Sequence, residues 1–172
     1  MRILHVIPNL LKGGAQRLAI DICNELTKID KVECKLLVLS NLKNEFAYCS
    51  SNIEIIYCNV KFKLSFLRSN IIEIEEYEKV INEFKPDIIH SHLYLAELIC
   101  HEKPNSNVKY ISHLHSNNPV FKKAKLSTFW RKEVIYKHYE KLRLKRKYQI
   151  ANKKYIAISK DTYNYFKTNI SE

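Results

Sequence analysis

Short apolar runs alternate with stretches of helical periodicity along the whole chain, and this alternation constrains the fold more than any other feature of the sequence. The run Arg2–Ile7 (RILHVI) has the length and composition of a strand that is buried on both faces. Gly13 and Gly14 follow it, and residues 15–28 then place their apolar side chains at helical spacing. A strand, a glycine turn and a helix in this order are typical of the opening of a parallel α/β unit.

The same alternation continues to the end of the chain. Further strands are predicted over 32–40, 52–58, 87–92, 108–115 and 154–159. Further helices are predicted over 69–85, with Pro86 as its stop, over 93–101, and over the basic range 126–149. Because crossovers between parallel strands are right-handed, we predict an α/β fold: a single Rossmann-like, doubly wound, mostly parallel sheet with helices on both faces. No internal repeat or linker-like composition divides the chain, so residues 1–172 are expected to form one domain.

Polar and turn-forming residues follow several of the predicted strands, at the edge where sheets of this kind bind ligands. They are Pro8, Asn9, Lys12, Gly13 and Gly14 after the first strand, His90, Ser91 and His92 at the fourth, His113, His115, Ser116 and Asn117 at the fifth, and Ser159 and Lys160 at the sixth. In the glycine pair, the missing side chains would let backbone amides and the positive helix end approach an anion. A tight turn that only starts the helix is the alternative for this pair.

Histidines spaced two positions apart occur at the ends of two predicted strands. His90 and His92 share one face of an extended chain, and so do His113 and His115, so each pair can look into one pocket. Hydrogen-bonded structural imidazoles are the alternative for any one of them. Four histidines at neighbouring strand ends favour a functional role for one or two.

Several other kinds of site find no support in the sequence. The five cysteines are widely spaced without a CxxC pair, and no HExxH or Cys/His ligand spacing accompanies the seven histidines, so neither a disulfide framework nor a metal site is predicted. A hydrolase would need a nucleophile elbow of the GxSxG type, which is missing. A dehydrogenase would need a glycine fingerprint and an acidic residue closing the second strand, where Cys34 and Ser40 stand instead.

The positive charge of the chain is concentrated in one segment. The formal net charge is +11, and between Lys122 and Lys147 eleven basic residues are found against two acidic ones. A solvated helix face explains such a segment. An anionic membrane surface explains it as well, because aromatic residues between the cations would anchor a helix there. These aromatic residues are Phe121, Phe129, Trp130, Tyr136 and Tyr139. Nucleic acid is a third anionic partner, but no nucleic-acid-binding motif is present.

The sequence does not predict a membrane-spanning segment. No window of about 18 uncharged apolar residues occurs, and the N-terminus lacks the apolar core and cleavage site of a signal peptide. We therefore expect a cytoplasmic protein. The basic segment suggests a peripheral position at the inner face of the cell membrane as the alternative.

Four blocks of sequence carry a resemblance to a known family. They are MRILHVIPNLLKGGAQRLAIDICNEL over 1–26, KPDIIHSHL over 85–93, VKYISHLHS over 108–116 and KYIAISKDTYNYF over 154–166. In this order and separation they resemble the N-terminal, acceptor-side domain of family 4 glycosyltransferases, which are built from two Rossmann-like domains in the arrangement called GT-B. The resemblance covers nearly the whole chain.

The resemblance implies a set of site residues. His115 matches the family histidine beside the transferred sugar and is the implied catalytic residue. Gly13 and Gly14 match the glycine loop that approaches the donor diphosphate, and His92 and Ser159 match family positions near the cleft between the domains. The resemblance also implies a nucleotide-sugar donor as substrate, no required metal or cofactor, and transfer with retention of configuration. The implied acceptor is a glycan or lipid-linked glycan of cell-surface polysaccharide synthesis.

In this family the groups that hold the donor belong to the second Rossmann-like domain. The sequence ends at Glu172, so we expect the donor-binding domain to be absent, the chain alone to be inactive or nearly so, and a donor-domain chain to be a partner. A non-catalytic remnant or a partner-dependent binding module is the competing hypothesis.

Overall fold

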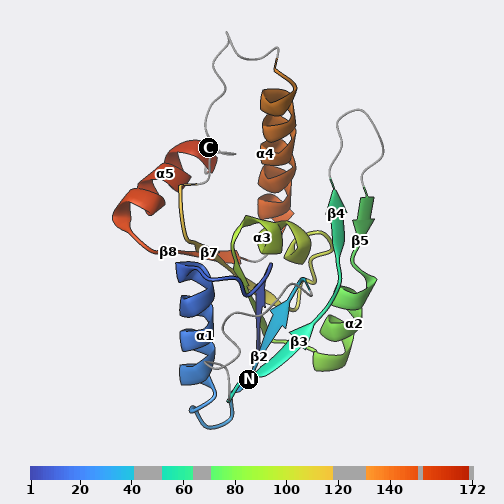
Figure 1. Ribbon diagram of the computed structural model, residues 1–172, viewed down its shortest axis with the longest axis vertical. Helices are drawn as coiled ribbons and strands as arrows, with labels where there is room; N and C mark the ends of the chain where they lie inside the picture. Colours follow the sequence, from blue (N-terminus) through green and yellow to red (C-terminus); the bar gives the residue numbers. More distant parts are fainter. Residues whose placement is uncertain (41–51, 64–70, 118–130, 151–152, 171–172) are drawn as a thin grey trace.

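A six-stranded parallel sheet forms the centre of the molecule (Figure 1). The computed structural model describes residues 1–40, 52–63, 71–117, 131–150 and 153–170. The strands of this sheet are β1 (Arg2–Ile7), β2 (Glu33–Val38), β3 (Glu54–Tyr57), β6 (Ile88–His92), β7 (Lys109–Leu114) and β8 (Lys153–Ala157). They lie in the order β3-β2-β1-β6-β7-β8, and every neighbouring pair is parallel. The predicted α/β fold is confirmed, and each predicted strand takes part in this sheet.

The direction in which the sheet is built reverses beside β1. Strands β2 and β3 extend the sheet on one side of β1, and the chain then returns to place β6 on the other side, followed by β7 and β8. The carboxyl ends of β1 and β6 therefore flank the point at which the strand order reverses. Doubly wound sheets bind their ligands at such a point, because the connecting loops diverge there and leave a crevice.

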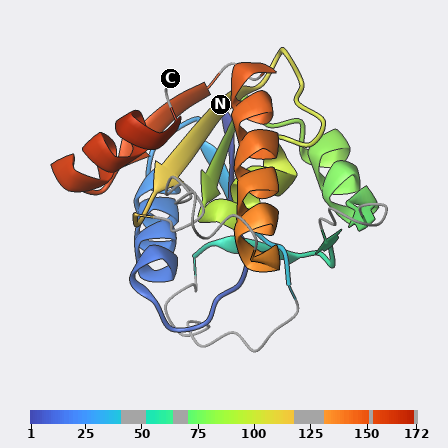
Figure 2. The ribbon, with the colours of Figure 1, turned by 90° about the horizontal axis from the view of Figure 1, so that it is seen from above.

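Helices cover both faces of the sheet, as predicted. They are α1 (Gly14–Leu26), α2 (Glu75–Phe84), α3 (Tyr94–Cys100), α4 (Lys132–Ile150) and α5 (Lys160–Ile170). Figure 2 shows the sheet between α1 on one side and α2, α3 and α4 on the other. Because both faces are covered, the central strands need apolar side chains at successive positions, which explains the continuous apolar run of β1.

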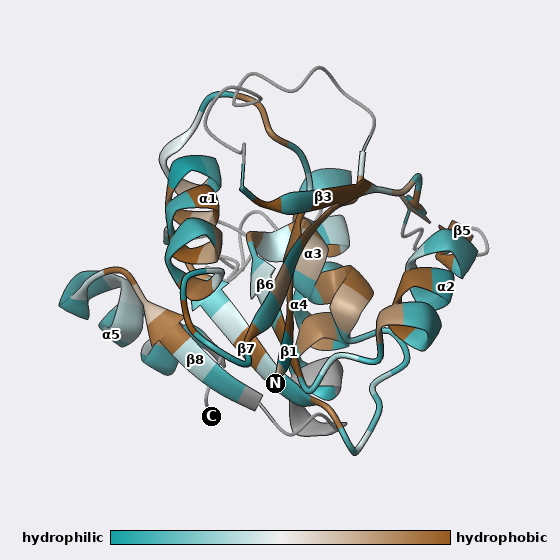
Figure 3. Cartoon of the chain, turned by 90° about the horizontal axis from the view of Figure 1, so that it is seen from below, coloured by the Kyte–Doolittle hydropathy of each residue, from teal (hydrophilic) through white to brown (hydrophobic). Residues whose placement is uncertain are grey.

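Two buried clusters lie on the two faces of the sheet. On the α1 face the cluster includes Ile7, Ala19, Ile20, Cys23, Leu36 and Val38. On the opposite face it includes Leu4, Val6, Leu37, Ile89, Ala96 and Ile99. Leu4 and Val6 therefore lie on one face of β1, and Ile7 lies on the other, as the alternation of side chains along a strand requires. Figure 3 shows hydrophobic and hydrophilic residues alternating around α1 and α2, as expected for helices with one buried side.

The prediction of a single helix over 69–85 is wrong at its start. Residues Ile71–Glu73 form strand β5, which pairs antiparallel with β4 (Lys61–Lys63) in a separate two-stranded sheet. The β-branched pair Ile71 and Ile72 favours a strand over a helix, and Ile72 lies opposite Phe62. Helix α2 occupies only the later part of the predicted range and ends before Lys85, which is left-handed (φ 51°). Pro86 disfavours helical backbone at the residue before it, so the predicted stop is confirmed.

The C-terminal third contains one expected helix and one that was not predicted. Helix α4 confirms the later part of the range 126–149, and residues 126–130 lie outside the described part of the chain. Helix α5 follows the block that carries Ser159 and was not predicted. Leu144 of α4 is fully buried against Leu98, Leu114 and Phe166, and it attaches α4 to the sheet.

Two further expectations concern cysteines and membrane spans. Cys23, Cys34, Cys58 and Cys100 are buried thiols that form no disulfide within the described residues, and Cys49 lies outside these residues. Among the helices that the structure describes, none combines the length and the apolar character that crossing a bilayer would require.

Candidate functional site

A pocket of about 320 Å³ opens at the carboxyl edge of the sheet, beside the point where the strand order reverses. Its lining comes from three connections: Pro8 and Asn9 after β1, Leu93, Tyr94, Leu95 and Glu97 after β6, and His113, Leu114, His115 and Ser116 at the end of β7. The prediction that polar groups from these strand ends converge is therefore confirmed for Asn9, His113, His115 and Ser116. Gly13, Gly14, His92 and Ser159 are not among the lining residues.

Five of the seven histidines form one cluster beneath this pocket. They are His5, His90, His92, His113 and His115, and neighbouring rings have centroids 4.4 to 5.3 Å apart. The sheet register brings them together, because His5 lies opposite His90 across β1 and β6, and His92 lies opposite His113 across β6 and β7. Side chains at alternate positions share a face, so these rings lie on the same face of three adjacent strands.

The predicted pairing of His90 with His92 and of His113 with His115 on shared faces is confirmed. The two rings of each pair stack with centroids 4.4 Å apart. His5 was missed, since it stands within the apolar run RILHVI and was taken as part of a buried strand. The available signal was a polar histidine inside an otherwise apolar strand, two residues before Ile7 and therefore on the same buried face.

Three of the imidazoles form a hydrogen-bonded chain from the core to the pocket. Nδ1 of His5 is 2.9 Å from Nε2 of His92, and Nδ1 of His92 is 3.1 Å from Nε2 of His115. A neutral imidazole has one N–H and one lone pair, so all protons along the chain must point in the same direction. If Nε2 of His115 donates to Nδ1 of His92, then Nδ1 of His115 keeps a lone pair. If Nδ1 of His92 donates instead, then Nδ1 of His115 carries the proton. The tautomer of a pocket residue is thereby coupled to the tautomer of a fully buried one.

Burial and mutual proximity lower the pKa values of four rings of the cluster and keep these rings uncharged near neutral pH: His90, His92, His113 and His115. Burial, followed by the neighbouring His5, His113 and His115, lowers the pKa of His90 to about 2. Burial, followed by His113, lowers the pKa of His115 to about 4. The pKa of His92 lies well below its usual value for the same reasons, with burial first and His90 next. Neutral rings can each donate and accept one hydrogen bond, which suits the recognition of hydroxyl groups.

Two kinds of donor set within the cluster could hold a metal ion. His5, His90 and His92, and separately His92, His113 and His115, offer ring nitrogens that all lie within 4.8 Å of one another. His5 also forms such a set with Cys23 and Cys34. Nε2 of His5, Nε2 of His90 and Nδ1 of His113 are buried and have no hydrogen-bond partner within the described residues.

The predicted glycine turn is built around a glutamine. Gly13 precedes α1 as its N-terminal cap residue without a side-chain cap, and its extended backbone (φ −176°) is open to any residue. A Cβ atom built on Gly13 would collide with Oε1 of Gln16, whose Nε2 donates to Oδ1 of Asn9 at 3.3 Å. Gly14 has open space around it. Gly13 therefore gives room to a buried side chain that ties the turn to the pocket residue Asn9.

Ser159 has a clear structural contact in the described structure. Its Oγ accepts a hydrogen bond from the backbone N–H of Thr162 at 3.1 Å, which caps the N-terminus of α5. Asn117 donates from Nδ2 to Oδ2 of Asp161 at 2.7 Å and thus joins the end of β7 to the same helix start. The two predicted polar positions after β7 and β8 therefore both contact the first turn of α5, and neither lines the pocket.

Sequence reasoning missed the acidic residue of the pocket. Glu97 lies in the apolar helix α3, and although only 3 % of its surface is exposed it lines the pocket together with Tyr94. An acidic residue that interrupts the apolar run LYLAELIC was the available signal. The pocket wall thus combines a carboxylate, a phenol, an amide and two imidazoles.

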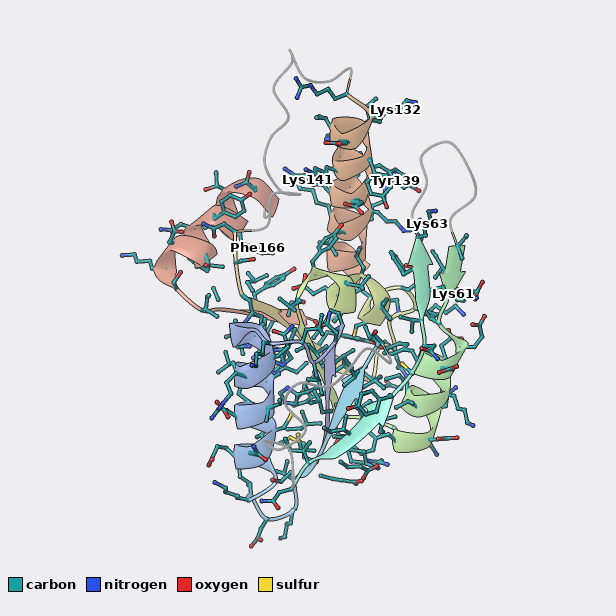
Figure 4. The ribbon with its side chains drawn as sticks, viewed as in Figure 1. Lys61, Lys63, Lys132, Tyr139, Lys141 and Phe166 are labelled. Atoms are coloured by element: carbon teal, nitrogen blue, oxygen red, sulfur yellow. The ribbon has the colours of Figure 1, made fainter. Side chains whose placement is uncertain are left out.

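Two elements that carry basic side chains, α4 and β4, extend beyond the carboxyl edge of the sheet. Figures 1 and 4 show α4 beginning above the strands, with Lys132 near its start, while β4 carries Lys61 and Lys63 on the same side. Three cations of α4 are exposed, Lys132, Lys137 and Arg146, and so is Arg131 directly before the helix. Arg143 is different, because it is mostly buried in an ion pair with Glu102 (N–O 2.7 Å) that connects α4 to the end of α3.

One comparison with known proteins identifies the family of most of the chain. The sequence profile named Glycosyltransferase Family 4 matches residues 12–171. A comparison with curated proteins gives no significant match. The matched range includes β2, β3, β6, β7 and β8, the pocket residues after β6 and β7, and every histidine of the cluster except His5. The four sequence blocks, the doubly wound sheet and this match agree, and the chain belongs to glycosyltransferase family 4.

Proposed function

We propose that the chain is the acceptor-side domain of a retaining glycosyltransferase that uses a nucleotide sugar and extends a cell-surface polysaccharide or a lipid-linked glycan. The main support is the pocket at the strand-order reversal, where His115 stands at the end of a buried imidazole chain. The donor-binding groups would come from a second Rossmann-like domain, in the same or in a separate polypeptide.

The pocket wall suits a sugar hydroxyl group as ligand. Glu97 and Asn9 supply acceptor oxygens, and His113 and His115 supply neutral rings that can donate or accept. Sugar rings present several hydroxyl groups that both donate and accept, so a wall of mixed polar groups matches them better than a wall of uniform charge.

His115 is proposed to orient the transferred sugar. His92 holds the His115 ring through a hydrogen bond, and His5 holds His92, so the ring is fixed before substrate binds. A fixed hydrogen-bonding group contributes to catalysis by positioning, because its orientation costs nothing at the moment of reaction. In the same-face mechanism implied by the family, the donor phosphate takes the proton of the acceptor hydroxyl.

The start of α1 is proposed to face the donor diphosphate. Its N-terminus carries no side-chain cap and no acidic residue in its first turn, so its partial positive charge is not neutralised there. Gly13 and Gly14 are both exposed and leave the backbone amides accessible. Such a helix start is a site for phosphate groups.

The test is an assay of the chain alone and in a mixture with the donor domain of a two-domain member of the family. UDP-glucose, UDP-N-acetylglucosamine and GDP-mannose are supplied with a membrane lipid extract as the acceptor source, and release of UDP or GDP is measured. We expect transfer only in the mixture, with retained anomeric configuration in the product by NMR. His115→Ala should lower kcat/KM by about 100-fold or more, whereas His138→Ala, at an exposed position of α4, should leave it unchanged.

The catalytic proposal has a defined contrary outcome. It fails if no donor domain restores transfer to the chain and if replacing the residue equivalent to His115 in a two-domain relative leaves that relative fully active. A non-catalytic binding module would then be the better description.

A second function, docking on an anionic membrane, is favoured by the exposed cations of α4. Lys132, Lys137 and Arg146 are exposed on α4, and Arg131 is exposed directly before it. The start of α4, marked by Lys132 in Figure 4, lies beyond the strands, and this position would present the pocket to a lipid-linked acceptor. We propose a cytoplasmic protein that binds peripherally at the inner face of the membrane. Each cation near an anionic surface contributes about 1 kcal/mol of binding free energy.

Vesicle flotation tests the membrane proposal. Vesicles of phosphatidylcholine are compared with vesicles that also contain phosphatidylglycerol, at low and high salt. We expect binding only to the anionic vesicles, weakened by salt and reduced about tenfold or more in the double variant Lys132→Gln with Lys137→Gln. The charge-matched control, Lys28→Gln in the turn after α1 with Lys79→Gln on α2, should bind like the parent chain. Equal binding to both vesicle types would remove the proposal.

A further inference from the structure

Three histidines beside the pocket have the spacing of a transition-metal site. His92, His113 and His115 each offer a ring nitrogen, and these nitrogens all lie within 4.8 Å of one another. Nδ1 of His92 and Nε2 of His115 are 3.1 Å apart. Two nitrogens bound to one tetrahedral Zn²⁺ at about 2.0 to 2.1 Å are themselves about 3.3 Å apart, so this pair needs little movement to share an ion.

The third member of the set contains a buried nitrogen that lacks a partner. Nδ1 of His113 is inaccessible to solvent and makes no hydrogen bond within the described residues. A buried polar atom without a partner is unfavourable, and a metal ion is one group that can use its lone pair. Buried water is the other candidate, since it satisfies polar atoms of this kind in many proteins.

A hydrogen bond from a neighbouring residue sets the required tautomer. His92 can coordinate through Nδ1 only if its proton is on Nε2, and that proton has an acceptor in Nδ1 of His5 at 2.9 Å. Histidine ligands of metals commonly donate their second nitrogen to a fixed acceptor, which orients the ring and raises its basicity. His5 supplies this contact from β1, while the ligands come from the ends of β6 and β7.

Access distinguishes this set from the two other donor sets. His5, His90 and His92 are all buried, and so are His5, Cys23 and Cys34. His115, by contrast, is partly exposed and lines the pocket together with His113. A metal bound to this set therefore has a route of entry and a fourth coordination position open to the pocket, as in sites that keep one position for water or substrate.

We propose that His92, His113 and His115 bind one divalent transition-metal ion, with His5 orienting His92 and with the fourth position facing the pocket. Three imidazoles suit Zn²⁺, Co²⁺, Ni²⁺ or Cu²⁺ and do not suit Mg²⁺ or Ca²⁺, which prefer oxygen ligands. No sequence motif predicts these three ligands as a metal site, because they come from the ends of two different strands. The proposal goes beyond sugar transfer, and a bound metal ion would hold the His115 ring in place of the hydrogen bond between Nδ1 of His92 and Nε2 of His115.

Cobalt binding to the EDTA-treated chain tests this site without any assay of activity. Co²⁺ is titrated into the purified chain, and the visible absorption typical of tetrahedral cobalt is recorded. We expect one bound ion per chain, displaced by Zn²⁺ and unaffected by a large excess of Mg²⁺. His113→Asn and His115→Asn should each weaken binding about 100-fold or more. His115 is only partly buried, so its replacement is the variant that best preserves folding.

Two control variants separate this site from other histidines. His138→Asn, on the exposed side of α4, should bind cobalt like the parent chain. His90→Asn removes a ring of the cluster that is outside the proposed set and should retain tetrahedral cobalt. Circular dichroism confirms that each variant is folded. The proposal is overturned if the parent chain binds no cobalt, if its cobalt spectrum is octahedral, or if binding persists in both His113→Asn and His115→Asn.

Discussion

The buried histidine cluster should make the folded chain unusually sensitive to mild acid. In the unfolded chain a histidine titrates near pH 6.5. In the folded chain burial is the first cause that lowers the pKa of His90 to about 2 and of His115 to about 4, and the pKa of His92 also lies well below the usual value. The folded state therefore binds fewer protons than the unfolded state below pH 6.5.

The sign and size of the effect follow from this difference in bound protons. The contribution of these histidines to the free energy of unfolding is present in full well above pH 6.5. It falls as the pH drops from 6.5 toward about 4, where His115 begins to accept a proton in the folded state. Each histidine that is protonated only in the unfolded state contributes a slope of about 1.4 kcal/mol per pH unit, so three give about 4 kcal/mol per pH unit. Between pH 8 and pH 5 the loss is then about 6 kcal/mol, which is comparable to the whole stability of many domains.

Urea unfolding followed by circular dichroism measures this slope. The free energy of unfolding is determined from pH 8 to pH 5 in buffers with EDTA, so that no metal occupies the imidazoles. Carboxylates are largely ionised over this range and contribute little. His90→Gln should reduce the slope below pH 6.5 by about 1.4 kcal/mol per pH unit. His138→Gln, at an exposed position, is the matched control and should leave the slope unchanged.

Two results would refute this reasoning. A slope in the parent chain of no more than about 1.4 kcal/mol per pH unit would mean that at most one histidine is held neutral by folding. A parent slope near the expected value that is unchanged in His90→Gln would place its origin outside the cluster.

Three further predictions concern packing, capping and the glycine turn. Leu144→Ala should lower the free energy of unfolding by about 2 to 5 kcal/mol, measured by urea unfolding, because the fully buried side chain attaches α4 to the sheet; a loss below about 1 kcal/mol would contradict that anchoring role. Ser159→Ala should lower the free energy of unfolding by about 1 kcal/mol in the same assay through loss of the α5 cap, and an unchanged free energy of unfolding would exclude the cap as a stabilising contact. Gly14→Ala should stabilise the chain by about 0.4 to 1 kcal/mol, because the added Cβ meets open space. If Gly14 also approaches the donor phosphate as proposed, transfer in the reconstituted assay should fall while stability rises, and unchanged transfer would argue against that role.

The fold could be predicted from the sequence because its signals are local. The continuous apolar run of Arg2–Ile7 and the glycine turn after it identify a strand and a helix from neighbouring residues alone. The start of α2 could not be predicted in this way. The β-branched residues Ile71 and Ile72 are compatible with the helix pattern that follows as well as with a strand, and pairing with Lys61–Lys63 decides for the strand.

The candidate site was predicted in part. The carboxyl-edge rule placed His113, His115 and Asn9 near a pocket, and the pocket contains them. Glu97 was missed because a helix that follows a strand can present any of its faces to the edge, and the burial of one acidic side chain depends on how the helix packs. The contact of Ser159 with α5 is short in sequence, but it was overlooked because that helix was not predicted.

The sequence by itself determined the alternation of strands and helices, the parallel sheet, the family and the edge at which polar residues gather. Each of these depends on residues close together in the chain or on the order of such segments. Only the tertiary structure decided that His5 joins His92 and that His92 joins His115, since those contacts cross strands 87 and 23 residues apart. The order and register of the strands determine which side chains on one face of the sheet contact each other. No local sequence pattern encodes this order and register. The imidazole chain, the depressed pKa values of His92 and His115 and the proposed metal site are therefore consequences of register.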